Sequence, residues 1–132
     1  MCLVIGRCSK IKEAIEDIIC YKILEKTKRG FVTPYRRVLV DVESKIMRAE
    51  GEIRVYTEFN EWVKKADKGV IHTFKNLDDA CEELEFFMST STSEFKIYKC
   101  IIPRGTLYYT GAYWKHPSYG SICIKFMSEC NV

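Results

Sequence analysis

Tyrosine and arginine side chains are the residues of this sequence best suited to hold a ligand. The chain contains eight tyrosines, among them Tyr35 directly before Arg36, and Tyr109 shortly after Arg104. A phenol ring stacks on a flat heterocycle, and a guanidinium group pairs with phosphate through two parallel hydrogen bonds. This combination predicts binding of a nucleotide-like molecule. The alternative is that the tyrosines cover half-buried faces of a sheet.

His72 and Thr73 are further candidates, because they end a segment of high β propensity just before an expected helix start. Unpaired backbone N–H groups at a helix N-terminus favour anions, and histidine titrates near neutral pH. A histidine that is hydrogen-bonded within the sheet is the alternative, and His116 is expected in an exposed loop. The predicted ligand-binding residues are therefore Tyr35, Arg36, His72, Thr73, Arg104 and Tyr109.

Sequence patterns of common enzymes and cofactor sites are missing from this chain. There is no P-loop, no dinucleotide-binding glycine motif, no nucleophile elbow and no H-E-x-x-H. The acidic pairs at 78–79 and 82–83 fit the solvated side of a helix. We expect no catalytic residue, no cofactor and no metal site. One enzymatic alternative stays open, in which removal of Met1 leaves Cys2 as an N-terminal nucleophile.

The seven cysteines point to a reducing compartment. No pair has C-x-x-C spacing, and the N-terminus lacks the apolar core of ~7–15 residues that a signal peptide needs. Thiols stay reduced in a cytoplasm. We therefore expect a cytoplasmic protein in which most cysteines are small buried apolar residues.

Length and composition predict one globular domain over residues 1–132, since domains most often run ~100–150 residues. The net charge of +3 is too small to indicate nucleic-acid binding. No apolar run approaches the ~18–20 residues that span a bilayer, so we expect no membrane insertion. A homo-oligomer is left open.

Residue periodicity predicts an α+β fold, with a mainly antiparallel twisted sheet and one amphipathic helix over about 76–88 packed on it. Apolar residues recur there at helical spacing, at Leu77, Ala80, Cys81, Leu84 and Phe87. Strands are expected at 18–24, 69–74, 95–102 and 121–127. We also expect a strand pair within 41–58, a short helix or loop over 59–67, and an aromatic-rich loop over 111–120.

Several ordered segments of the chain resemble small proteins encoded by bacteriophages and prophages. These segments are MCL (1–3), ICYKIL (19–24), TPYR (33–36), GVIHTF (69–74), KCIIPRGT (99–106) and YGS (119–121). The resemblance implies a cytoplasmic accessory protein of an infected bacterium that neutralises a host defence, in some cases by sequestering a nucleotide signal.

Residues 69–126 also resemble ADP-ribosyltransferase-like folds, through HTF at 72–74 and the segment 95–106. Those enzymes place a catalytic glutamate near their last strands, where this chain has YGSIC at 119–123. The resemblance thus implies a nucleotide-binding relative without transferase activity. Our leading hypothesis is a non-enzymatic protein that sequesters a small nucleotide-like ligand. The alternatives are a protein–protein inhibitor of a host factor and an ADP-ribosyltransferase-like enzyme.

Overall fold

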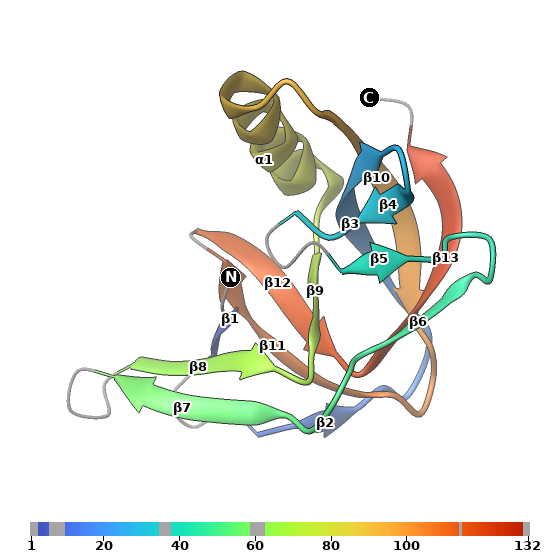
Figure 1. Ribbon diagram of the computed structural model, residues 1–132. Coiled ribbons are helices and arrows are strands. Elements are labelled where there is room, and N and C mark those ends of the chain that lie inside the picture. Colours follow the sequence, from blue (N-terminus) through green and yellow to red (C-terminus); the bar gives the residue numbers. More distant parts are fainter. Residues whose placement is uncertain (1–2, 6–9, 35–37, 59–62, 114, 131–132) are drawn as a thin grey trace.

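The computed structural model describes residues 3–5, 10–34, 38–58, 63–113 and 115–130. Thirteen strands and one helix are found in this part of the chain (Figure 1). The strands are β1 Leu3–Ile5, β2 Lys12–Glu13, β3 Ile18–Thr27, β4 Gly30–Val32, β5 Leu39–Val40, β6 Ile46–Arg48, β7 Arg54–Glu58, β8 Val63–Lys68, β9 Ile71–Phe74, β10 Glu94–Ile102, β11 Leu107–Tyr113, β12 His116–Ser121 and β13 Cys123–Cys130.

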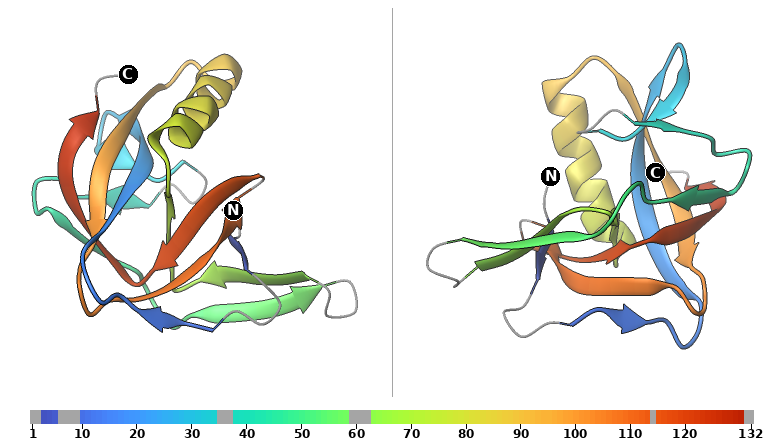
Figure 2. Two further views of the ribbon diagram at one scale, coloured as in Figure 1. Left: turned by 180° about the vertical axis from the view of Figure 1, so that it is seen from behind. Right: turned by 60° about the horizontal axis from the view of Figure 1, so that its bottom comes forward.

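All thirteen strands belong to one strongly curled sheet, in the order β6-β13-β10-β3-β9-β12-β11-β1-β8-β7. The short strand β2 pairs with β11, and β4 pairs with both β3 and β5. Every pairing between described strands is antiparallel. The β7–β8 hairpin extends away from the rest of the sheet (Figure 2). The predicted α+β class is confirmed.

The helix α1, Leu77–Thr90, confirms the helix predicted over 76–88. Its buried face carries Ala80 and Leu84, which pack toward β3, β9 and β10. Asn76 occupies the N-cap position, but its side chain makes no cap hydrogen bond. Its Nδ2 instead donates to Asp79 Oδ2 at 3.1 Å. No helix in the described part of the chain is long and apolar enough to cross a membrane.

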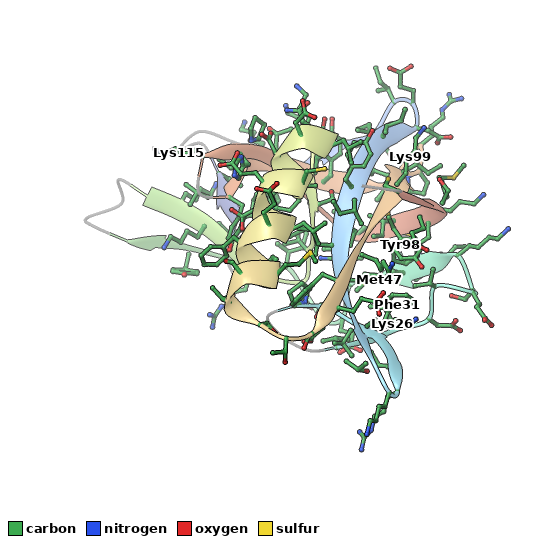
Figure 3. The ribbon with its side chains drawn as sticks, turned by 90° about the horizontal axis from the view of Figure 1, so that it is seen from above. Lys26, Phe31, Met47, Tyr98, Lys99 and Lys115 are labelled. Atoms are coloured by element: carbon green, nitrogen blue, oxygen red, sulfur yellow. The ribbon has the colours of Figure 1, made fainter. Side chains whose placement is uncertain are left out.

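Two apolar clusters lie on opposite faces of β3 and β10. One cluster, under α1, includes Ile23, Leu84 and Ile97. The other cluster contains Leu24 and Tyr98, with the half-buried Met47 and Phe31 packed against it. Figure 3 shows Phe31, Met47 and Tyr98 on the side of these strands away from the helix. Residues of β4, β5 and β6 therefore cover the face of β3 and β10 that α1 leaves free.

Three local expectations are wrong. The strands β6 and β7 within 41–58 do not pair with each other, because β6 joins β13 and β7 joins β8. Residues 63–67 of the expected helix or loop belong to β8. The expected loop 111–120 is mostly the hairpin of β11 and β12, in which Tyr113 pairs with His116. In each case long-range pairing, which local composition does not report, decides the structure.

Candidate functional site

A buried lysine connects two strands where the sheet opens. The strands β3 and β9 share one paired position, Tyr21 with Phe74. Next to it, Lys22 is only 6% exposed, and its Nζ donates a hydrogen bond of 2.8 Å to the backbone oxygen of His72. No carboxylate oxygen of the described residues lies within 4.0 Å of this Nζ. Lys22 is thus a buried cation without an acidic partner, which is rare in proteins.

Burial also governs the protonation of Lys22. Loss of hydration lowers the pKa of its amine from 10.5 to about 8, an effect that the neighbouring Cys100 and Cys20 partly oppose. Burial raises the pKa of both thiols, that of Cys20 to about 11, so they are neutral near pH 7. The amine therefore has no counter-charge beside it.

Lys22 and His72 both line a cavity of about 300 Å³. We call it the Lys22 cavity. Its lining comes from residues 33–34, 38–41 and 46–50, together with Leu3 of β1, Ala66 of β8 and residues 69–72. Most of the wall is apolar, with side chains that include Leu3, Val40, Met47, Ala66, Val70 and Ile71. Besides Lys22, the charged members of the lining are the exposed residues Asp41, Arg48 and Glu50. Such a cavity can hold a small ligand that has an apolar body and one polar end.

His72, which also lines the cavity, carries a second polar group. Its ring makes edge contacts with Phe74 and Tyr113, at centroid distances of 4.8 and 5.1 Å. Its Nε2 is buried and has no hydrogen-bond partner among the described residues. Burial, together with the charge of Lys22, lowers the pKa of His72 well below its ordinary value. The neutral imidazole can therefore exchange a hydrogen bond with a ligand without adding charge.

The structure brings only part of the predicted binding set together. His72 lines the Lys22 cavity, whereas Thr73, Arg104 and Tyr109 do not. Thr73 is fully buried. Arg104 is exposed in the turn after β10, where its backbone N–H bonds Asp17 Oδ1 at 2.9 Å. The remaining two, Tyr35 and Arg36, lie outside the described residues.

Tyr109 and His72 lie on one face of the sheet, with Gly120 of β12 between them. Gly120 pairs with Tyr109 on one side and with His72 on the other. The space above this glycine is taken by Leu3 and Val70, since a Cβ there would lie 2.8 Å from Leu3 Cδ2 and 3.2 Å from Val70 Cγ2. A buried leucine thus fills the gap between the two predicted residues.

Sequence reasoning missed Lys22, the residue at the centre of this site. A signal was present, because Lys22 interrupts the apolar run at 18–24. A charge inside a buried strand indicates either an ion pair or a functional group. The strand itself was predicted, but its one charged member was not singled out.

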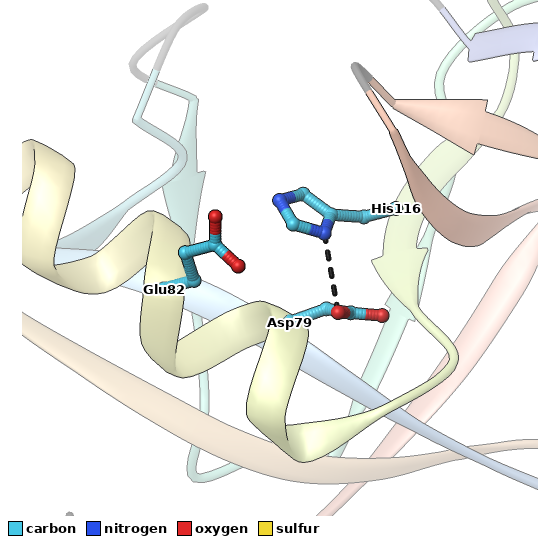
Figure 4. A group of neighbouring side chains, drawn as sticks. All are labelled: Asp79, Glu82 and His116. Atoms are coloured by element: carbon cyan, nitrogen blue, oxygen red, sulfur yellow. Dashed lines mark ion pairs between the residues drawn. The ribbon is translucent and has the colours of Figure 1, made fainter.

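A second polar group joins α1 to the sheet (Figure 4). His116 is 9% exposed on β12, so its predicted place in an exposed loop is wrong. Its Nδ1 lies 3.2 Å from Asp79 Oδ1, and its Nε2 lies 3.5 Å from Glu83 Oε1. Glu82 belongs to the same group, since one ligand atom each of Asp79, Glu82 and His116 lie within 4.8 Å of one another. Burial raises the pKa of Glu83, an effect that His116 opposes. Ion pairing between helix and sheet accounts for this geometry.

Comparison of the chain with protein-family models, curated proteins and solved structures finds no match.

Proposed function

We propose that this protein is a non-enzymatic binder that sequesters a small nucleotide-like ligand in the Lys22 cavity. The observation that carries the proposal is a largely apolar cavity of about 300 Å³ lined in part by the cation Lys22, which has no carboxylate partner among the described residues. An apolar wall accepts a heterocycle, and a buried ammonium gains most from a ligand that brings a negative oxygen. The free Nε2 of His72 supplies one further hydrogen bond.

Cavity size limits the part of the ligand that is enclosed. Small-molecule pockets span ~300–1,000 Å³, so this one stands at the lower end of the range. It suits one base or one sugar phosphate.

The carboxylates that line the cavity, Asp41 and Glu50, are exposed and lie more than 4.0 Å from the Lys22 amine, which favours binding over transfer chemistry. Among the described residues no carboxylate lies within 4.0 Å of Lys22 Nζ. The β12 segment YGS at 119–121 carries no carboxyl group where a transferase would place its glutamate. General acid–base catalysis needs such a group within hydrogen-bond reach of the substrate. The setting, the cytoplasm of an infected bacterium, and the role against a host defence are part of this proposal and follow only from the expectation drawn from the sequence segments.

Calorimetric titration with a nucleotide panel tests the proposal. The panel contains nucleoside monophosphates, cyclic dinucleotides and cyclic ADP-ribose isomers. At least one member should bind, and Lys22→Met should weaken that binding by at least ~10-fold, or ~1.4 kcal/mol. Arg104→Ala is the matched control, because it removes an exposed cation outside the cavity. Lack of heat with every member, or equal binding by Lys22→Met, would contradict the proposal.

One observation favours a second candidate function, the inhibition of a partner protein. On α1, Phe86 is 57% exposed and Met88 is 55% exposed. Large exposed apolar side chains are common anchors of protein interfaces. A pull-down from bacterial lysate that captures one protein in stoichiometric amount, and loses it with Phe86→Ser, would favour this function.

A further inference from the structure

The surroundings of Lys22 differ from those of a structural buried lysine. A lysine in a protein core is normally paired with a carboxylate, which offsets the loss of hydration. Here the single acceptor among the described residues is the His72 oxygen, which takes one of the three ammonium N–H groups. Lys22 and His72 both line the cavity, so this hydrogen-bonded pair borders it.

Burial favours the neutral amine of Lys22, and the neighbouring thiols of Cys100 and Cys20 oppose this effect only in part. Cys20 and Cys100 stay protonated near pH 7, and His72 is neutral, so no described group next to the amine carries a negative charge. Burial therefore keeps the pKa of Lys22 at about 8. At pH 7 the lowered pKa makes the neutral fraction of the Lys22 amine about 300 times that of an ordinary lysine. A desolvated neutral amine is a nucleophile suited to carbonyl compounds.

We propose that Lys22 captures a small aldehyde or ketone in the cavity as an imine. The Nζ lone pair attacks the carbonyl carbon, and the resulting carbinolamine loses its hydroxyl group as water. A C=N bond then joins ligand and protein, with no change in oxidation state. The apolar wall favours this dehydration because it excludes water.

This inference rests on the proposed function, since it needs a ligand in the same cavity. It also narrows the ligand class. A nucleotide-like molecule qualifies only if its sugar has a free anomeric carbon, because such a sugar opens to an aldehyde. Covalent capture would make sequestration slow to reverse without any enzymatic turnover.

Reductive trapping tests the imine directly. Wild-type protein is incubated at pH 7 with propanal, or with ribose 5-phosphate, in the presence of sodium cyanoborohydride. Peptide mapping by mass spectrometry then gives the modification rate of each lysine. Lys26 is the internal control, because it is an exposed lysine on the same strand, β3. Lys22 should be modified at least ~10-fold faster than Lys26 by one of the two probes. This preference should vanish in denaturant.

Equal rates at Lys22 and Lys26, or a preference that survives unfolding, would overturn the inference. Lys22→Arg keeps a cation but cannot form the imine, so it should lose the trapped adduct while Lys26→Arg retains it. The peptide map of wild-type protein decides the question even if Lys22→Arg fails to fold. Binding of a panel nucleotide, combined with equal modification of Lys22 and Lys26 by both carbonyl probes, would refute the imine and leave the proposed function standing.

Discussion

Replacement of Lys22 by methionine should stabilise the protein at pH 7. The pKa of Lys22 falls from 10.5 to about 8 on folding, and a shift of this size corresponds to ~3 kcal/mol of unfavourable free energy when both states are charged. The variant loses one hydrogen bond, to the oxygen of His72, worth ~1 kcal/mol. Methionine fills similar space without a charge. We therefore expect a net gain of ~2 kcal/mol in the free energy of unfolding.

The pH dependence of this gain identifies its cause. Below pH 8 Lys22 is protonated in both the folded and the unfolded protein, and its unfavourable contribution to stability is complete. Between about pH 8 and pH 10.5 the unfolded protein binds more protons than the folded one, so this contribution becomes smaller as the pH rises. The advantage of the variant should therefore shrink by ~1 kcal/mol between pH 8 and pH 9. Cys20 and Cys100, whose pKa values burial raises, act in the opposite direction, destabilising the protein above about pH 9. Lys22 lowers the pKa of both thiols, so its removal raises those values further. At pH 9 and below the folded thiols stay protonated in both proteins, so the difference between the proteins contains no thiol contribution.

Urea unfolding of wild type and Lys22→Met at pH 7, 8 and 9 measures this difference, with Lys26→Met as the control for loss of an exposed charge. The control should change the free energy of unfolding by less than ~0.5 kcal/mol at each pH. A Lys22→Met variant that is less stable than wild type by a constant amount at all three pH values would refute the reasoning. It would mean that the amine is well paired in the folded protein.

Three further outcomes follow from the packing. Cys20 and Cys100 should resist alkylation by iodoacetamide at pH 8 in the folded protein and react fully in denaturant, because both are 0% exposed and have raised pKa values. Mass spectrometry measures the extent of alkylation. Rapid labelling of the folded protein would contradict the burial of these thiols. Leu84→Ala should lower the free energy of unfolding in urea by ~2–4 kcal/mol, because it leaves a cavity between α1 and the sheet. Phe86→Ala, on the exposed face of the helix, should lower it by less than ~1 kcal/mol. Similar losses for the two variants would mean that the helix packs by another face. Gly120→Val should lower the melting temperature and reduce the free energy of unfolding by ~1–3 kcal/mol, because the new side chain meets atoms of Leu3 and Val70. An unchanged melting temperature would contradict the close packing at this glycine.

Local sequence signals predicted the elements that have strong periodicity. The helix at α1 was predicted because Leu77, Ala80 and Leu84 repeat at helical spacing, and β3 because its residues are apolar and β-branched. The hairpin of β11 and β12 was missed, since its Gly111, Pro117 and Gly120 are typical of loops. There, neighbours on both sides of β12 supply the pairing that outweighs local propensity.

The candidate site was predictable only in part, because it depends on how distant segments meet. Residue types identified His72, which does line the Lys22 cavity, but they gave no reason to separate it from Arg104 and Tyr109. The importance of Lys22 depends on missing acidic neighbours in three dimensions. No local pattern reports that absence. A glutamate, Glu25, lies on the same strand as Lys22, and the sequence alone does not tell whether its carboxylate reaches the amine.

Chemical-shift mapping by NMR tests the central claim most directly, because it locates the bound ligand. Backbone amide spectra are recorded while each panel nucleotide is added to the wild-type protein. The account predicts saturable shifts centred on residues of the Lys22 cavity, such as Val40, Ile71 and His72. Shifts confined to the region of Arg104 and Tyr109, or no saturable shift with any nucleotide, would contradict it.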